Sequence, residues 1–234
     1  MYSNLFSPES IEELTAALQT QFLSAIWETF YVTLLSTAFA IVIGLPLGVL
    51  LVAGERDGVL PLPRWLMSVL NVLINLLRSI PFLILMIMVF PLSRLLIGTA
   101  VGTTATIVPL VVAAFPFVAR LVETSLRELD EGVVEAAQSM GATPFQIITK
   151  VMIPECLPGL ISSMTTALTT ILGYSAMSGV IGGGGLGKIA LSYGYYRYQT
   201  DIMIVCVILL VLMVQVFQTL GTAWATRSDK RLRK

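Results

Sequence analysis

Long apolar stretches alternate with short polar connections along most of the chain. A helix of about 20 apolar residues is long enough to cross the hydrocarbon core of a bilayer. Five stretches approach or exceed this length, at residues 30–52, 65–97, 103–122, 157–181 and 202–222. The pattern therefore predicts an all-α membrane protein with five transmembrane helices.

The second stretch is too long for one straight crossing. Pro81 interrupts a helix because it lacks a backbone N–H, so we expect a short interfacial helix and a crossing of about 16 residues. Arg78, close to this break, is the one charge expected within the membrane zone. Two interpretations stay open, since Arg78 can reach the cytoplasmic headgroups or pair with another subunit or a gate.

Composition excludes several classes of protein. Hydrophobic residues make up 56% of the chain and charged residues 12%, with a mean hydropathy of +0.88, whereas soluble domains carry about 25% charged residues. There is no histidine, and Cys156 and Cys206 are isolated from each other. A net charge of zero does not indicate a nucleic-acid partner. We therefore expect no soluble enzyme, no catalytic residue and no metal or cofactor site.

The distribution of Lys and Arg predicts the topology. One set of connections, with the C-terminal tail, holds ten of the fourteen basic residues, and the opposite set holds only Arg94, Lys188 and Arg197. Basic residues concentrate on the cytoplasmic side, so we expect the N-terminus outside and the C-terminus in the cytoplasm. Residues 1–29 are then a periplasmic or interfacial segment, residues 30–222 the transmembrane domain, and residues 223–234 a cytoplasmic basic tail.

The connection between spans three and four, about residues 123–155, is long and has the pattern of two short amphipathic helices. The first carries its apolar residues at Val133, Val134, Ala137 and Met140, and Gly141 suits its end because glycine accepts a left-handed conformation.

The second helix has the start signals Thr143 as N-cap, Pro144 at the first position and Gln146 to complete a capping box. Its expected apolar stripe is Phe145, Ile148 and Val151 or Met152.

The same connection resembles the EAA loop of permease subunits of bacterial ABC importers, whose pattern is E-A-A-x3-G-x9-I-x-L-P. Glu135, Ala136, Ala137, Gly141 and Pro154 match it, and Val151 and Ile153 keep the apolar character of the remaining positions. The segments RSIPFLIL, VGTTATIVPL, GYSAMSGVIGGGGLG and YGYYRY are similar to permeases of methionine uptake importers. The resemblance extends over about residues 30–224.

This resemblance implies a type I ABC importer permease fold in the bacterial inner membrane, with cytoplasmic coupling helices between spans three and four. It implies that the residues at or near the contact with a separate ATPase are Glu135, Ala136, Ala137, Gly141, Ala142 and Thr143. ATP and magnesium would be bound by that ATPase and not by this chain. The implied partners are a second copy of the chain, two cytoplasmic ATPase subunits, a periplasmic or lipid-anchored methionine-binding protein and membrane lipids.

The fourth span is the most polar of the five. Its candidate path-lining residues, most of them on one helical face, are Ser162, Thr166, Thr169, Gly173, Tyr174 and Met177. Such a face can line a wet path between two copies, or it can join helices through small residues and hydroxyl bonds. Met177 can contact a thioether substrate or simply fill space. Spans three to five carry no charge deep in the membrane, so we expect selectivity to reside in an external binding protein.

Other functions fit these residues less well. GGGGLGK mimics a phosphate loop, but Ile189 stands where Ser or Thr should bind magnesium, and a tight external hairpin is the alternative. An intramembrane enzyme would need a nucleophile paired with a base, or paired aspartates, and the predicted spans contain neither. An ion-coupled carrier normally needs an intramembrane carboxylate. A permease for another amino acid, a quaternary amine or a phosphonate shares the EAA loop and stays open.

Overall fold

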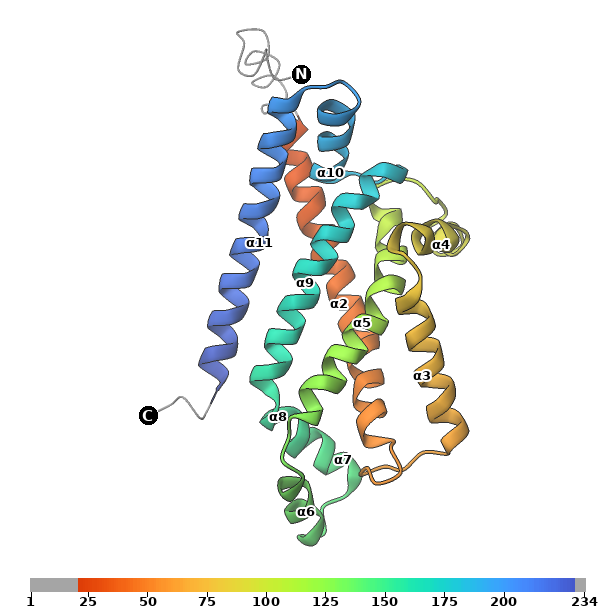
Figure 1. Ribbon diagram of the computed structural model, residues 1–234, viewed down its shortest axis with the longest axis vertical. Coiled ribbons are helices and arrows are strands. Elements are labelled where there is room, and N and C mark those ends of the chain that lie inside the picture. Colours follow the sequence, from red (N-terminus) through yellow and green to blue (C-terminus); the bar gives the residue numbers. More distant parts are fainter. Residues whose placement is uncertain (1–20, 230–234) are drawn as a thin grey trace. The chain divides into compact units, whose positions relative to one another are not determined.

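The computed structural model describes residues 21–229, and every regular element in that range is a helix (Figure 1). Most of the predicted N-terminal segment and the last five residues of the basic tail lie outside the described residues. Four helices are long and apolar enough to cross a membrane: α2 (Leu23–Ala53), α5 (Ile107–Arg127), α9 (Leu157–Ser178) and α11 (Thr200–Ser228). They coincide with four of the predicted spans, but α2 begins before residue 30 and α11 continues past residue 222.

The second predicted span is divided in two, as expected. α3 (Arg64–Ser79) and α4 (Phe82–Ile97) form a bent pair, which brings the number of candidate spans to five when it is counted as one. Ile80 leaves the helical region with φ −80° and ψ 127°, because the ring of Pro81 disfavours a helical residue before it. Both helices have 16 residues, so neither is markedly shorter than the other.

The chain divides into two compact units, and each long helix contributes residues to both. Of the described residues, unit 1 comprises 21–37, 82–112 and 168–217, and unit 2 comprises 38–81, 113–167 and 218–229.

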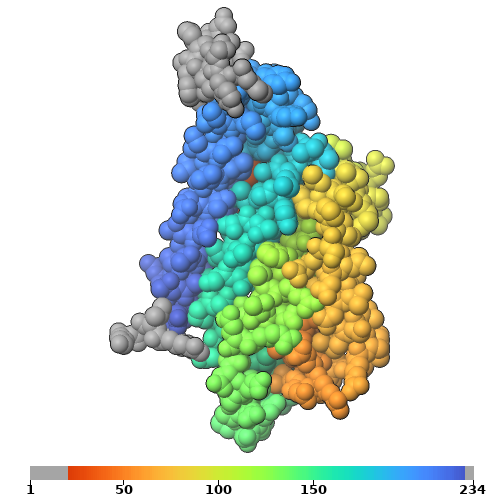
Figure 2. Space-filling view, viewed as in Figure 1, coloured from red at the N-terminus to blue at the C-terminus, as the bar shows by residue number. Residues whose placement is uncertain are grey.

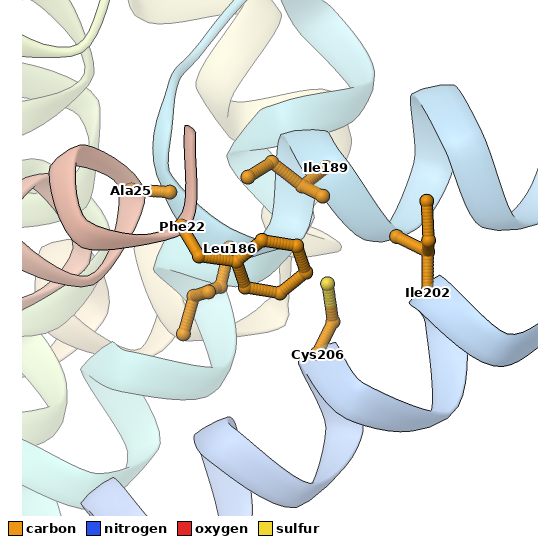
Figure 3. Close-up of a cluster of buried hydrophobic side chains, with 6 residues drawn as sticks. All are labelled: Phe22, Ala25, Leu186, Ile189, Ile202 and Cys206. Carbon is orange, nitrogen blue, oxygen red and sulfur yellow. The ribbon is translucent and has the colours of Figure 1, made fainter. Parts of the chain in front are cut away.

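Unit 1 has an apolar core where the start of α2 meets α10 (Gly185–Ile189) and α11. Figure 3 shows its buried side chains gathered around one point: Phe22, Ala25, Leu186, Ile189, Ile202 and Cys206. The N–H of Leu186 donates to Oγ1 of Thr29 at 2.9 Å. The same turn of α2 thus supplies both apolar packing and a polar contact for α10.

Unit 2 packs α2 tightly against α5. A side chain added at Gly48 would lie 2.5 Å from the carbonyl oxygen of Ala119, so only glycine allows this approach of the two backbones. Leu51, Ile74 and Ala119 are buried together, and they join α2, α3 and α5.

Candidate functional site

The long connection after α5 is folded, as its sequence predicts. α6 (Glu131–Ser139) is capped by Asp130, whose Oδ1 accepts the N–H of Gly132 at 2.8 Å. Gly141 follows the end of α6 with φ +78°, the left-handed conformation that glycine adopts without strain. The predicted end of this helix at Gly141 is confirmed.

The second helix, α7 (Pro144–Ile147), begins with the predicted capping box. The N–H of Thr143 donates to Oε1 of Gln146 at 2.9 Å, and the N–H of Gln146 donates to Oγ1 of Thr143 at 3.4 Å. The chain then continues through a π-helical turn, η3 (Ile148–Met152), and α8 (Ile153–Glu155) into α9. A defined turn therefore separates two rigid helical pieces.

The apolar stripe expected on the second helix is wrong in part. Ile147 and Met152 are the buried residues, whereas the side chain of Phe145 is 75% exposed. The expected stripe assumed α-helical spacing throughout, whereas the chain forms a π-helical turn, with i→i+5 hydrogen bonds, from Ile148 to Met152. Met140 is 81% exposed although it was expected on the buried face of the preceding helix.

The sequence pattern did not predict that Phe145 and Met140 lie on the surface. They flank the turn between α6 and α7, and with Gly141, Ala142 and Thr143 they form a protruding surface that we call the loop tip. Figure 2 shows this part of unit 2, in green, next to the orange surface of the α2–α3 connection. Two large exposed apolar side chains on a capped turn are suited to insertion into a partner's cleft.

The predicted ATPase-contact residues divide into two groups. Glu135, Ala136, Gly141 and Thr143 are exposed, and Ala142 is half-buried. Ala137 is 4% exposed, and its carbonyl oxygen accepts the N–H of Ala142 at 3.2 Å. The side chain of Ala137 is therefore buried, whereas the other five predicted residues reach the surface.

Glu135 faces a different surface from the loop tip. It lines a cavity of about 490 Å³ between α6 and the α2–α3 connection. Glu55, Asp57 and Glu131 also line this acidic cavity, with Arg127 at its edge. Arg127 donates to Oε1 of Glu55 at 2.6 Å. A partner side chain that enters this cavity should be cationic, because carboxylates outnumber the single guanidinium.

The polar face of α9 is largely uncovered. In its unit 2 part, Ser162 and Thr166 are exposed, and the hydroxyl of Thr166 donates to the carbonyl oxygen of Ser162 at 3.0 Å. In its unit 1 part, Gly173 and Met177 are exposed and Thr169 is half-buried. A side chain added at Gly173 would have no atom within 4 Å. The described residues leave room along this helix for water or for a second chain, so both interpretations stay open.

Two further candidate residues are placed by the structure. The ring of Tyr174 is half-buried because it stacks on Phe82 with centroids 4.4 Å apart. Arg78 is exposed in the last turn of α3, about 20 Å along the axis from Arg64 at its start. Both interpretations of Arg78 stay open.

The glycine-rich segment before α10 has no free phosphate cradle. The N–H of Gly185 donates to Oε2 of Glu28 at 2.8 Å, and the position of a side chain on Gly184 is occupied by Glu28 and Thr103. Gly182 and Gly185 have φ +90° and +82°, so the segment is the tight turn expected from its sequence. Within residues 21–229, no cluster of three or more Cys, Asp or Glu residues is able to hold a metal ion.

The structure has several candidate membrane-spanning helices joined by short connections and one folded loop. These features define a multi-pass membrane subunit. The chain belongs to the family of binding-protein-dependent transport system inner membrane components, whose model matches residues 44–234. A probable D-methionine transport system permease protein of Vibrio cholerae is 49% identical over 212 residues, which covers 89% of this chain and 92% of the relative. The corresponding protein of Pasteurella multocida is 48% identical over 87% of this chain and 94% of its own.

Solved structures agree with this membership. An inward-facing conformation of the MetNI methionine ABC transporter matches with a TM-score of 0.87 and 42% identity, over 89% of this chain and 96% of that chain. An amino acid ABC transporter at 20% identity has a TM-score of 0.72 and shows the shared fold alone. The predicted type I importer permease fold is confirmed.

Proposed function

We propose that the chain is the transmembrane subunit of an ATP-driven importer that carries methionine into the cell. Similarity to D-methionine permeases and to a methionine ABC transporter supports this cargo. The observation that carries the proposal is the folded loop after α5, with Met140 and Phe145 exposed on a capped turn. Such a surface allows a separate subunit to bind the loop and to displace it.

The loop tip is the proposed contact with a cytoplasmic ATPase, which binds ATP and magnesium. Burying a Met or Phe side chain contributes about 1.5–3 kcal/mol, so the two exposed residues supply a substantial part of a docking energy. The acidic cavity beside the tip adds a site for a cationic side chain of the same partner. Two ATPase subunits would serve two copies of this chain.

The charge distribution supports an N-terminus outside and a C-terminus in the cytoplasm. Unit 2 contains the end of α2, the start of α3, the end of α5 and the folded loop. Apart from Arg78, which lies at the far end of α3 from Arg64, its described basic residues are Arg56, Arg64, Arg120, Arg127, Lys150 and Arg227. Unit 1 holds Arg94, Lys188 and Arg197. Unit 2 is therefore the proposed cytoplasmic end of the protein.

A homodimer supplies the proposed translocation path. The uncovered face of α9, with Ser162, Thr166, Gly173 and Met177, would meet the same face of a second copy across a two-fold axis. α9 contains no charged residue, so it offers no strong site for a zwitterion. A separate binding protein outside the membrane would therefore select methionine.

Uptake into reconstituted vesicles tests the cargo. The chain with its ATPase and binding protein should accumulate labelled methionine when ATP is supplied, and unlabelled methionine should compete. Equal competition by other amino acids, or by a quaternary amine or a phosphonate alone, would contradict methionine as the cargo. Vesicles without the binding protein are the matched control, and they should show little uptake.

A further inference from the structure

Arg120 is a charged residue inside a membrane-spanning helix. Arg127 ends α5 seven residues later, which is about 10 Å along the axis. The side chain of Arg120 is 18% exposed, and its Nη1 donates to Oε2 of Glu123 at 2.5 Å. A largely buried charge is stable only when it is paired and hydrogen-bonded, so the partners of Arg120 matter.

The guanidinium of Arg120 also connects two helices. Its Nη2 donates to Oδ1 of Asn71 at 2.8 Å and to Oδ1 of Asn75 at 2.9 Å, and both asparagines belong to α3. They lie four residues apart and so share one face of the helix. We call Asn71, Asn75 and Arg120 the α3–α5 clamp.

The asparagine at the first position is oriented for this role. Nδ2 of Asn71 donates to the carbonyl oxygen of Met67 at 2.9 Å, which directs its Oδ1 towards Arg120. An amide uses its nitrogen as donor and its oxygen as acceptor, so both ends of Asn71 are engaged. Arg120 suits the other side because its planar fork presents several donors at once.

The clamp continues towards the cytoplasmic loop of unit 2. Glu123, which accepts from Arg120, also accepts from Nη2 of Arg127 at 3.0 Å. Arg127 in turn donates to Glu55 in the α2–α3 connection at 2.6 Å. This chain of polar contacts therefore runs from α3 through α5 to the edge of the acidic cavity.

The polar groups of the clamp are not needed to hold α3 against α5. Ile74 and Ala119, each next to a clamp residue, are buried with Leu51 and already join α3 to α5. Replacing a buried charged group and its partners by apolar residues of similar volume is often neutral or stabilising. The clamp contributes directional hydrogen bonds, which fix the position of α3 along the axis of α5.

We propose that Arg120 is a positioning residue that makes α3 follow the loop after α5 during the transport cycle. The inference rests on the proposed function, in which an ATPase displaces this loop. α5 reaches α6 through only Glu128, Leu129 and Asp130, so displacement of the loop acts directly on α5. α3 leads to the break at Pro81. Without the clamp, movement of α5 no longer reaches α3, and ATP is hydrolysed without transport.

The double variant Asn71→Leu/Asn75→Leu tests this in the complete reconstituted complex. Transport per ATP hydrolysed should fall by about tenfold, the size of a typical coupling between sites, while ATP hydrolysis continues. Asn71→Leu/Asn75→Asp should regain coupling, because a carboxylate restores a strong acceptor for Arg120. The control Val69→Leu/Val72→Leu changes the exposed face of α3 and should leave the ratio unchanged. An unchanged ratio in Asn71→Leu/Asn75→Leu would overturn the inference.

A second measurement does not depend on the cargo. Spin labels at Val72 of α3 and Thr124 of α5, both exposed, report the distance between the helices in complexes diluted with unlabelled chain. That distance should be the same without nucleotide and with trapped ATP in the wild type, and it should change with ATP in Asn71→Leu/Asn75→Leu. A change in the wild type, or none in the variant, would overturn the clamp. Failure of wild-type methionine uptake alone would instead count against the proposed cargo.

Discussion

The ring of Tyr174 in α9 lies flat against the ring of Phe82, with centroids 4.4 Å apart and planes inclined by 8°. Phe82 is the first residue of α4, immediately after Pro81. Both rings belong to unit 1, so the stack holds the start of α4 against α9. Tyr174 is also a predicted path residue, and the ring face that stacks on Phe82 is not available to a cargo.

Loss of this stack should destabilise unit 1. Tyr174→Ala removes the aromatic pair, which contributes about 0.5–1.5 kcal/mol beyond the buried area, whereas Tyr174→Phe keeps it. The temperature at which half the detergent-solubilised protein remains monodisperse should therefore fall for Tyr174→Ala and stay close to wild type for Tyr174→Phe. Equal losses in both variants would mean that the hydroxyl group, and not the stack, stabilises this contact.

The loop tip should be needed for ATPase binding but not for folding. Met140→Ala/Phe145→Ala removes two exposed side chains, so the free energy of unfolding should change little, since exposed positions rarely matter for stability. Co-purification of the ATPase should be lost or strongly reduced. The matched control Val133→Ala, also an exposed apolar residue of α6, should retain the ATPase. Full ATPase binding by the double variant would remove the tip from the interface.

The turn within the loop should depend on its caps. Thr143→Ala removes the acceptor for the N–H of Gln146, and loss of an N-cap costs about 0.5–2 kcal/mol. Limited proteolysis in membranes lacking the ATPase should therefore cut this variant faster between α6 and α7. Thr143→Ser preserves the hydroxyl and should be cut at the wild-type rate. Identical rates for all three proteins would show that the capping box does not order the turn.

Two glycines should differ in their sensitivity to replacement by alanine. Gly184→Ala places a methyl group where Glu28 and Thr103 already lie, so it should lower the thermal stability of unit 1. Gly173→Ala enters open space on α9 and should not harm folding of the single chain. Measured melting temperatures separate the two variants, and a stable Gly184→Ala protein would contradict the packing of the glycine-rich turn.

Local features were predictable from the sequence because their partners are neighbours in the chain. The capping box joins Thr143 to Gln146, and the break at Pro81 depends on a single ring. The clamp was not predictable, since Arg120 and Asn71 lie 49 residues apart and nothing in helical periodicity pairs them. The exposure of Phe145 was missed for another reason: the expected stripe assumed one continuous α-helix, whereas a π-helical turn follows α7 and the buried residues are Ile147 and Met152.

The central claim is that this membrane subunit is moved by a partner that hydrolyses ATP. The most direct test is to measure which energy source drives methionine uptake. Vesicles that contain the chain, its ATPase and its binding protein are compared under ATP alone and under an ion gradient alone. Methionine should accumulate only with ATP, and Met140→Ala/Phe145→Ala should abolish that accumulation. Accumulation by an ion gradient without ATP, or by the purified chain without the ATPase, would contradict the proposed mechanism.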